Sequence, residues 1–299
     1  MNRSFWVLVM ALSLSSTAMS ADDGRRAHFS AKNGHCRFCD LRYEDLSTRD
    51  LSGADFTGAF LHGINFSWSA LTNGRFSSAN LVLGRMEWAD FDGADLSKAY
   101  LEDAAMFRAT FRNADFRMAN LSGANLSSSE LGGANLVTAI LRRTDLSGAR
   151  INNANLRQAD LTGANLQGAR VRESDLQGAT LDAANLQGCD LTNSNLSGAS
   201  LRGASFQSTY VHEANFRKAD LSGADFRNAL VEAVNFGGAN LSKADFTGAI
   251  LRNNILAGAN VCQAKLPDGS LGICESPVKE KRGDPSASDG APDIAADKI

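Results

Sequence analysis

Residues 159–168 read Ala-Asp-Leu-Thr-Gly-Ala-Asn-Leu-Gln-Gly, and the same five-residue pattern returns at 219–223 as Ala-Asp-Leu-Ser-Gly. We denote by i the large apolar residue at the centre of each unit, such as Leu161. Stepping by five from Leu41 to Leu266 gives 46 i positions, and every one holds Leu, Phe, Ile, Val or Met. Position i−2 is usually Ala or another small residue. A period of five fits neither a helix nor a plain strand, so the chain is a repeat protein.

These units resemble the pentapeptide-repeat family, whose repeat is A-(D/N)-L-x-x. The resemblance implies an all-β fold, a right-handed quadrilateral parallel β-helix in which four units form one coil. Positions i and i−2 then point inward, and i−1, i+1 and i+2 point outward. The repeats make about 11–12 coils, in which residues 20 apart stack roughly 4.8 Å apart on one face. Proline would interrupt the ladder between coils, and all four prolines follow residue 266.

Composition divides the chain into five segments. Residues 1–20 are typical of a signal peptide, with Arg3, an apolar run over 5–14 and small residues at a cleavage site. We expect an N-terminal cap or flexible segment at 21–35, the β-helix at 36–266, a C-terminal cap at 267–275 and a disordered tail at 276–299. The apolar run is about half the roughly 20 residues that span a membrane. We therefore expect export to the periplasm or beyond the cell, with no membrane span after cleavage.

The cysteines fit an oxidising compartment. Cys36 falls on an i position and Cys39 on an i−2 position, which leaves three interpretations open: a local disulfide, two inert core thiols, or a metal or redox site with His35. A lone C-x-x-C is weak evidence for zinc, and we predict no metal and no cofactor. The C-terminal end resembles the Cys-bracketed Pro-Asp-Gly endings of exported family members, which implies a disulfide between Cys262 and Cys274.

Catalytic motifs are absent from the sequence. It contains no nucleophile elbow, phosphate-binding loop, zinc-protease motif or dinucleotide fingerprint. The recurrent Asp and Asn residues at i−1 belong to the repeat, and we expect their side chains to bond to the backbone. A net charge of −3 argues against a basic nucleic-acid binder. We therefore assign no catalytic residues, and we predict a chain that is not an enzyme and binds no nucleic acid.

The most informative surface positions are aromatic. A coil of 20 residues places Trp68 directly below Trp88, both at the outward position i+2, with Phe107 beside them. The preceding face carries Phe60, Val82, Leu83 and Tyr100 at outward positions. Exposed aromatic clusters of this size usually mark interaction sites.

Two further expectations concern what the outward apolar residues contact. The segment 22–35, which contains Phe29, is an alternative cover for the aromatic cluster, and the sequence does not decide between cover and exposure. A second outward apolar column near the C-terminal end is formed by Tyr210, Leu230 and Ile250. It predicts either the seam of a homodimer or a contact with the chain beyond Leu271.

The leading functional hypothesis is a non-catalytic exported scaffold that binds an envelope or extracellular protein through the aromatic cluster. The alternative is a cell-wall or carbohydrate binder that uses the same rings as platforms for sugars. A third class, mimicry of duplex DNA toward a topoisomerase, is implied by resemblance to cytoplasmic family members that confer quinolone resistance. The expected export and the mild net charge both count against it.

Overall fold

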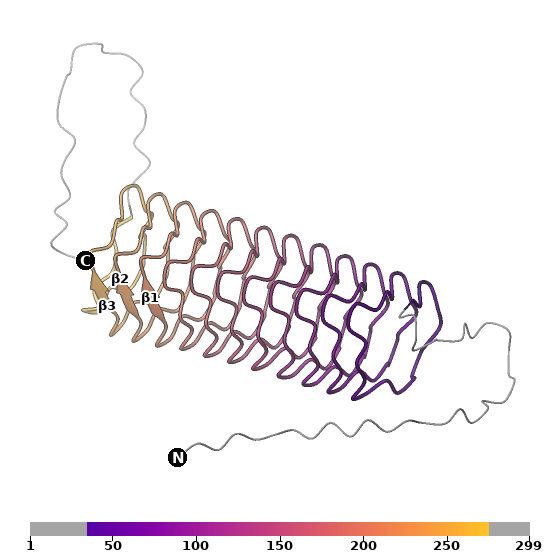
Figure 1. Ribbon diagram of the computed structural model, residues 1–299. Coiled ribbons are helices and arrows are strands. Elements are labelled where there is room, and N and C mark those ends of the chain that lie inside the picture. Colours follow the sequence, from indigo (N-terminus) through magenta and orange to yellow (C-terminus); the bar gives the residue numbers. More distant parts are fainter. Residues whose placement is uncertain (1–34, 275–299) are drawn as a thin grey trace, which may run out of the picture.

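The computed structural model describes residues 35–274, which form a straight rod (Figure 1). Parallel bridges join residues 20 apart along the whole rod, from His35 and Asp55 to Asp245 and Lys265. Twenty residues are four five-residue sides, so the fold is the right-handed quadrilateral β-helix that the repeat predicts. At about 4.8 Å per coil the rod is roughly 55 Å long. Residues 35–274 contain no helix with the length and apolarity needed to cross a membrane.

Most rungs of the ladder are single bridges, and three regular strands lie at the C-terminal end. They are β1 (Tyr210–His212), β2 (Leu230–Glu232) and β3 (Ile250–Arg252). They form a parallel sheet in the order β1-β2-β3, which aligns Tyr210, Leu230 and Ile250 in one column. The column expected from the 20-residue step is therefore present.

Each side of a coil ends in a tight turn. The amide of Ala54, for example, donates to the carbonyl of Leu51 at 3.0 Å, and this bond recurs in nearly every unit. Residue i+2 of every unit from 38 to 263 has a positive φ. Glycine adopts this left-handed conformation without strain, as Gly53 does, whereas a side chain is disfavoured there. The turn thus explains why Gly is frequent at i+2.

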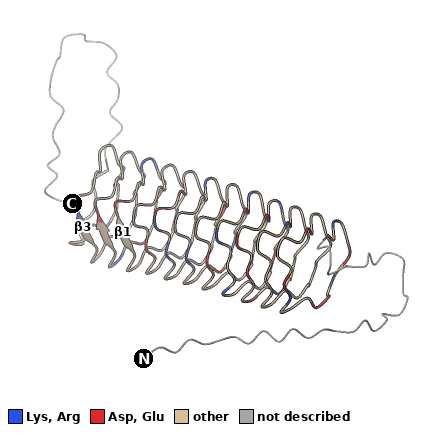
Figure 2. Cartoon of the chain, in the orientation of Figure 1, with Lys and Arg blue, Asp and Glu red and all other residues tan. Residues whose placement is uncertain are grey.

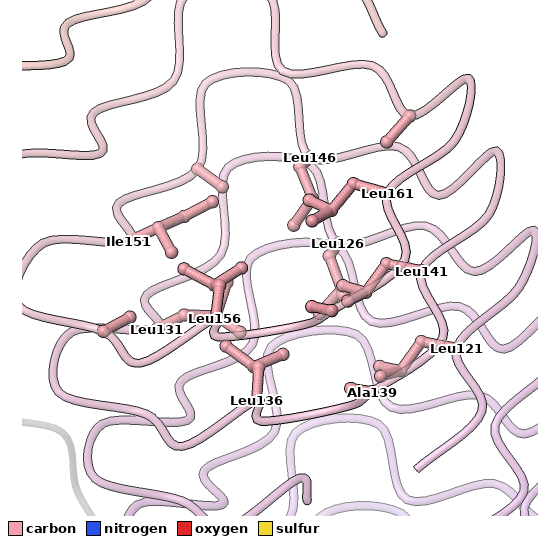
Figure 3. Close-up of a cluster of buried hydrophobic side chains, with 14 of the residues drawn as sticks. Leu121, Leu126, Leu131, Leu136, Ala139, Leu141, Leu146, Ile151, Leu156 and Leu161 are labelled. Carbon is pink, nitrogen blue, oxygen red and sulfur yellow. The ribbon is translucent and has the colours of Figure 1, made fainter. Parts of the chain in front are cut away.

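The core contains one large and one small side chain per side. The leucines of Figure 3, from Leu121 to Leu161, are at most 1% exposed, and Ala139 between them is fully buried. Where Ser or Thr replaces Ala at i−2, its hydroxyl is satisfied. Thr144 donates to the carbonyl of Leu121 at 2.8 Å, for example. The rod therefore has a continuous apolar interior without an orphaned hydroxyl at these positions.

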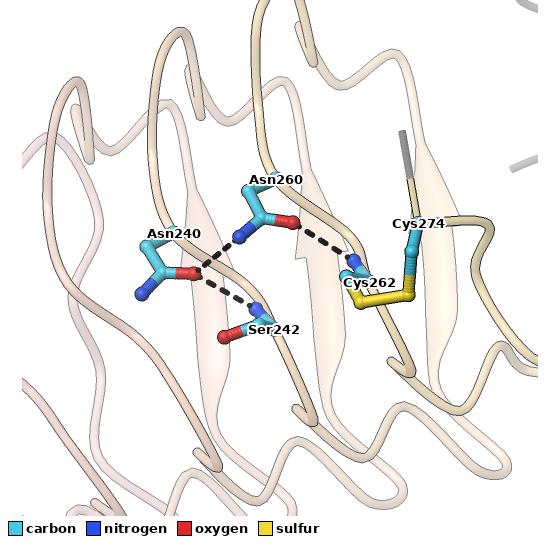
Figure 4. Close-up of a disulfide and its surroundings, with 5 residues drawn as sticks. All are labelled: Asn240, Ser242, Asn260, Cys262 and Cys274. Carbon is cyan, nitrogen blue, oxygen red and sulfur yellow. Dashed lines mark hydrogen bonds between the residues drawn. A yellow bond between two sulfur atoms is a disulfide. The ribbon is translucent and has the colours of Figure 1, made fainter. Parts of the chain in front are cut away.

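The C-terminal end is closed by a reversal of the chain. Leu266 donates its amide to the carbonyl of Ser270 at 2.8 Å, and Lys265 then pairs with Leu271 in antiparallel fashion. A disulfide joins Cys262 to Cys274, as the resemblance implied (Figure 4). This cap covers the side of the last coil that contains residues 261–266, and it leaves the sides that contain residues 249–258 without a covering coil.

Candidate interaction surface

Two indole rings form the core of the aromatic surface. The rings of Trp68 and Trp88 stack with centroids 4.9 Å apart and an interplanar angle of 6°. The guanidinium of Arg108 lies 4.7 Å from the Trp88 ring centroid, and Phe107 meets Trp88 edge-on at 6.1 Å. We call these four residues the tryptophan ridge. Trp68 is 60% exposed and Trp88 40% exposed, so the outward orientation predicted from the sequence is confirmed.

The backbone holds this ridge rigidly. The amide of Trp68 donates to the carbonyl of Glu87 at 3.0 Å, and the amide of Trp88 donates to the carbonyl of Phe107 at 3.1 Å. The hydroxyl of Ser67 also donates to the Glu87 carboxylate at 2.7 Å. The coils therefore fix the spacing of the indoles before any partner binds.

Both tryptophans occupy a strained backbone position. Their φ values are 64° and 61°, in the left-handed region where glycine or asparagine is the usual residue. A bulky residue in this conformation costs of order 1–3 kcal/mol. The fold does not need an indole there, because glycine fills the same position in the coils at Gly148 and Gly168. Side chains occupy this left-handed position in most units of the rod, so the two tryptophans are distinguished by their stacked and exposed rings rather than by their backbone.

The predicted aromatic cluster spans two faces, with Phe60 and Tyr100 on the face that precedes the tryptophan ridge. Phe60 and Tyr100 are about half exposed, but they lie two coils apart in an i−1 column with Asn80 between them. Neither ring contacts an indole among the ring pairs of residues 35–274. The reason is geometric, because i−1 lies in the middle of a side while i+2 lies at a corner.

The second surface, which we call the apolar face, contains the column of Phe60 and Tyr100 together with Leu83, which the sequence also placed at an outward position. Sequence reasoning missed four further exposed apolar side chains on the same side and its two corners: Phe38, Tyr43, Met118 and Ile140. All lie in the first six coils, and the same side is polar from Asp160 onward. Reading every column at a step of 20 residues would have found them.

The predicted C-terminal column is only partly open. Tyr210 is 38% and Ile250 50% exposed, while Leu230 between them is half-buried. Its role as a dimer seam remains a prediction. The alternative cover of the tryptophans by the segment 22–35 lies outside the described residues except for His35, and the expected signal peptide and tail lie outside them entirely.

Two disulfides and one free thiol account for the cysteines. Cys36 and Cys39 form a disulfide inside the first coil, which decides among the three interpretations. Cys189 is fully buried, and this burial raises the pKa of its thiol because the thiolate would be desolvated. Within residues 35–274 no group of His, Cys, Asp or Glu side chains is arranged to hold a metal ion.

The Asp residues at i−1 bond mainly to the backbone, as predicted. Asp50 accepts the amide of Ser52 at 3.1 Å, two residues along the chain. Some also pair with an arginine 18 residues earlier, at i+1 of the preceding coil, and these pairs are Arg37–Asp55, Arg142–Asp160, Arg157–Asp175 and Arg172–Asp190. Figure 2 shows acidic and basic residues interspersed along the rod. The Asp side chains at i−1 therefore have a structural role.

This chain belongs to the pentapeptide-repeat family. Eight overlapping matches to the model "Pentapeptide repeats" fall between residues 35 and 198, and the model "Pentapeptide repeat region" matches residues 179–261. Proteins of this family are generally non-enzymatic structural or interaction proteins.

Several solved structures are similar to this chain. HetL from the cyanobacterium Nostoc sp. strain PCC 7120, involved in heterocyst differentiation regulation, is 27% identical over 83% of this chain and 94% of its own, with a TM-score of 0.41. A pentapeptide repeat protein from the Arabidopsis thaliana thylakoid lumen is 32% identical over 36% of this chain and 68% of its own, at 0.18. The fluoroquinolone resistance protein QnrB1 is 21% identical over 64% of this chain and 92% of its own, at 0.27. No curated protein matches the sequence.

Proposed function

We propose that this chain is a non-catalytic exported scaffold that binds an envelope or extracellular protein through the tryptophan ridge. The single observation that carries the proposal is the exposed stack of Trp68 on Trp88, held at left-handed corners that glycine fills in other coils of the same column, as at Gly148 and Gly168. Tryptophan and arginine are the residues that most often supply binding energy at protein interfaces. The rod fixes both in advance, so little side-chain entropy is lost on binding.

Export is supported by the cysteine chemistry. Both ends of the described rod carry a disulfide, Cys36–Cys39 and Cys262–Cys274, and disulfides persist in oxidising compartments. The expected signal peptide at 1–20 agrees with this location. We infer no enzymatic activity, because the repeat explains the carboxylates and the ridge contains no acid, base or nucleophile.

The geometry of the ridge favours a protein over a sugar polymer. Sugar platforms present open ring faces side by side, whereas here Trp88 has Trp68 on one face and Arg108 on the other. The edges of the indoles and the ring face of Trp68 away from Trp88 remain for a partner. The interspersed charges of Figure 2 likewise lack the acidic stripes that mimicry of duplex DNA would need.

The proposal is tested by crosslinking in native envelope and exported fractions, with the tagged full chain as bait. The ridge variant carries Trp68→Gly and Trp88→Gly, which suit the left-handed corners. The control variant carries Met118→Ser and Ile140→Ser, which remove comparably exposed side chains from the apolar face. We expect a partner protein that the parent and the control recover and the ridge variant loses at least tenfold. Equal recovery by both variants would contradict the proposal, and binding to protein-free cell wall would favour the carbohydrate alternative.

A further inference from the structure

The C-terminal end of the rod has an open β edge beside its cap. In the preceding coil, the amides of Ala233, Phe236 and Gly238 donate to carbonyls of the last coil at 2.8–2.9 Å. The equivalent amides of the last coil belong to Leu251, Asn253, Leu256 and Gly258. None of these four has an acceptor among residues 35–274, and the carbonyls of Ala249 and Asn254 have no donor there. Each such group is normally paired in a folded protein.

Apolar side chains flank the same edge. Leu251 and Leu256 occupy i positions but are only half-buried, whereas Val231 and Phe236 one coil below are at most 2% exposed. They line a small apolar cavity together with Phe236 and Phe246. The cap does not cover them, because Pro267–Ser270 turns the chain back onto the neighbouring side. A strand that fits this edge must therefore carry two large apolar residues five positions apart.

We propose that residues 293–299 add a strand to this edge, which completes the twelfth coil and begins a thirteenth. Their sequence is Asp-Ile-Ala-Ala-Asp-Lys-Ile, in which Ile294 and Ile299 have the five-residue spacing of Leu251 and Leu256. This segment contains no proline, and Asp293 falls at i−1, where the repeat favours Asp or Asn. The composition of the tail alone predicts disorder. The open edge is the additional observation, because it defines the register in which residues 293–299 would pair.

The backbone register satisfies the open groups. With Ile294 above Leu251, the carbonyls of Asp293 and Ala295 accept the amides of Leu251 and Asn253, and the amide of Asp293 donates to Ala249. Ala296 then takes the left-handed corner position, a conformation that Ala183 and Ala233 already adopt in this rod. The new strand continues the parallel order β1-β2-β3 by one.

Charge complementarity supports the same register. Arg252 occupies i+1 beside the edge, is exposed and has no ion pair among residues 35–274. Four arginines at i+1 pair with an aspartate at i−1 of the next coil, as Arg142 does with Asp160 at 2.6 Å. In the proposed coil the residue at that i−1 position is Asp293. Arg252 and Asp293 thus reproduce an ion pair that the rod uses repeatedly.

The connecting chain is long enough for residues 293–299 to reach this edge. Residues 275–292 extend to roughly 60 Å at about 3.3 Å per residue, which exceeds the length of the rod. Asp297 falls at i−2, where Ala is usual, but the residue beneath it is Asn254, another polar exception at the solvent-facing end. Docking within one chain also benefits from a high effective concentration.

Amide hydrogen exchange of the full chain tests the proposal at residues 250–258. The test variant carries Ile294→Asp and Ile299→Asp, and the control carries Val278→Asp, an apolar residue of the same tail outside the register. We expect Leu251, Asn253 and Leu256 to exchange at least tenfold faster in the test variant than in the parent and the control. Equal exchange in all three chains would overturn the proposal. Protection that increases with protein concentration and survives the test variant would also overturn it, in favour of a second copy at this edge.

A crosslink tests the register independently of stability. Asn253→Cys with Ala296→Cys places two cysteines in adjacent corner positions, and Asn253→Cys with Ala287→Cys is the control. We expect an intramolecular disulfide between residues 253 and 296 in the first chain at least tenfold faster than between residues 253 and 287 in the second. Equal rates would contradict the register.

Discussion

At the scale of single residues, the fold requires a left-handed backbone at position i+2 and tolerates several residue types there. Every unit needs a left-handed residue there, and glycine meets that need without strain. Tryptophan at 68 and 88 meets it at a cost, offset in part by ring stacking and by Arg108. Other side chains adopt the same conformation in most units, so it is the exposure and stacking of the indoles that single them out. Glycine at this position supplies a substitution that removes the indole surface without harming the rod.

Replacing Trp68 and Trp88 by glycine is expected to leave stability nearly unchanged. Losing the stack and the cation–π contact removes about 1–2 kcal/mol. Relieving two left-handed side chains returns about 2–4 kcal/mol, and the extra backbone entropy of two glycines in the unfolded chain offsets about 1–2 kcal/mol of that gain. We predict a melting temperature within roughly 4 °C of the parent, measured by circular dichroism. A drop above about 10 °C would show that the indoles support the fold rather than a partner.

Asp225 predicts a pH dependence. The guanidinium of Arg227 donates to this carboxylate at 2.6 Å, and the amide of Gln207 donates to it at 2.6 Å, which lower its pKa to about 2. Because the unfolded value is about 3.9, this stabilisation is present above pH 4 and is lost as the pH falls toward 2.

Asp225→Asn should therefore unfold at lower denaturant concentration than the parent at pH 7, and the difference should vanish near pH 2. Glu173→Gln, at an exposed corner, controls for the loss of one negative charge. A difference between parent and Asp225→Asn that is constant from pH 7 to pH 2 would refute the role of this carboxylate.

At the scale of the elements, one side of a coil is the smallest unit of packing. Leu141 is 1% exposed within the layer of leucines in Figure 3, and the closely spaced coils above and below leave little room for the core to collapse. We predict that Leu141→Ala lowers the free energy of unfolding by about 2–5 kcal/mol. The corner variant Arg143→Ala should change it by less than about 0.5 kcal/mol. Comparable effects of the two, in denaturant titrations, would contradict the inward assignment of i.

The C-terminal cap depends on its disulfide. The Cys262–Cys274 bond closes a loop of 12 residues, and a loop of that size contributes about 3 kcal/mol in the chain-entropy model. Replacing both cysteines with alanine should expose the amides of Gln263 and Gly272 to exchange while the central coils stay protected, because repeats unfold locally. Uniformly faster exchange along the whole rod would show that the cap controls global stability instead.

At the scale of the whole molecule, the period alone predicts almost all of the fold. An unbroken register of 46 apolar positions fixes the coil, the inward residues and the columns of residues 20 apart, since each coil repeats the last. The Trp68–Trp88 stack follows from the same arithmetic. The step of 20 residues also places Phe60 and Tyr100 on the preceding face, but it does not predict whether their rings contact the indoles, because that depends on corner geometry. Nor does it predict the half-open end, which results from the reversal after Pro267.

The proposed function requires that the tryptophan ridge be exposed to solvent in the full chain. In the full chain with Trp6→Phe, Trp68 and Trp88 are the only tryptophans, so intrinsic fluorescence reports on the ridge alone. Acrylamide quenching of that emission is the decisive measurement. We predict efficient quenching and the red-shifted emission of solvated indoles, as 60% and 40% exposure require. Blue-shifted emission that resists quenching would mean that another part of the chain, such as residues 22–35, covers the ridge, and it would contradict the assignment of this surface to a partner.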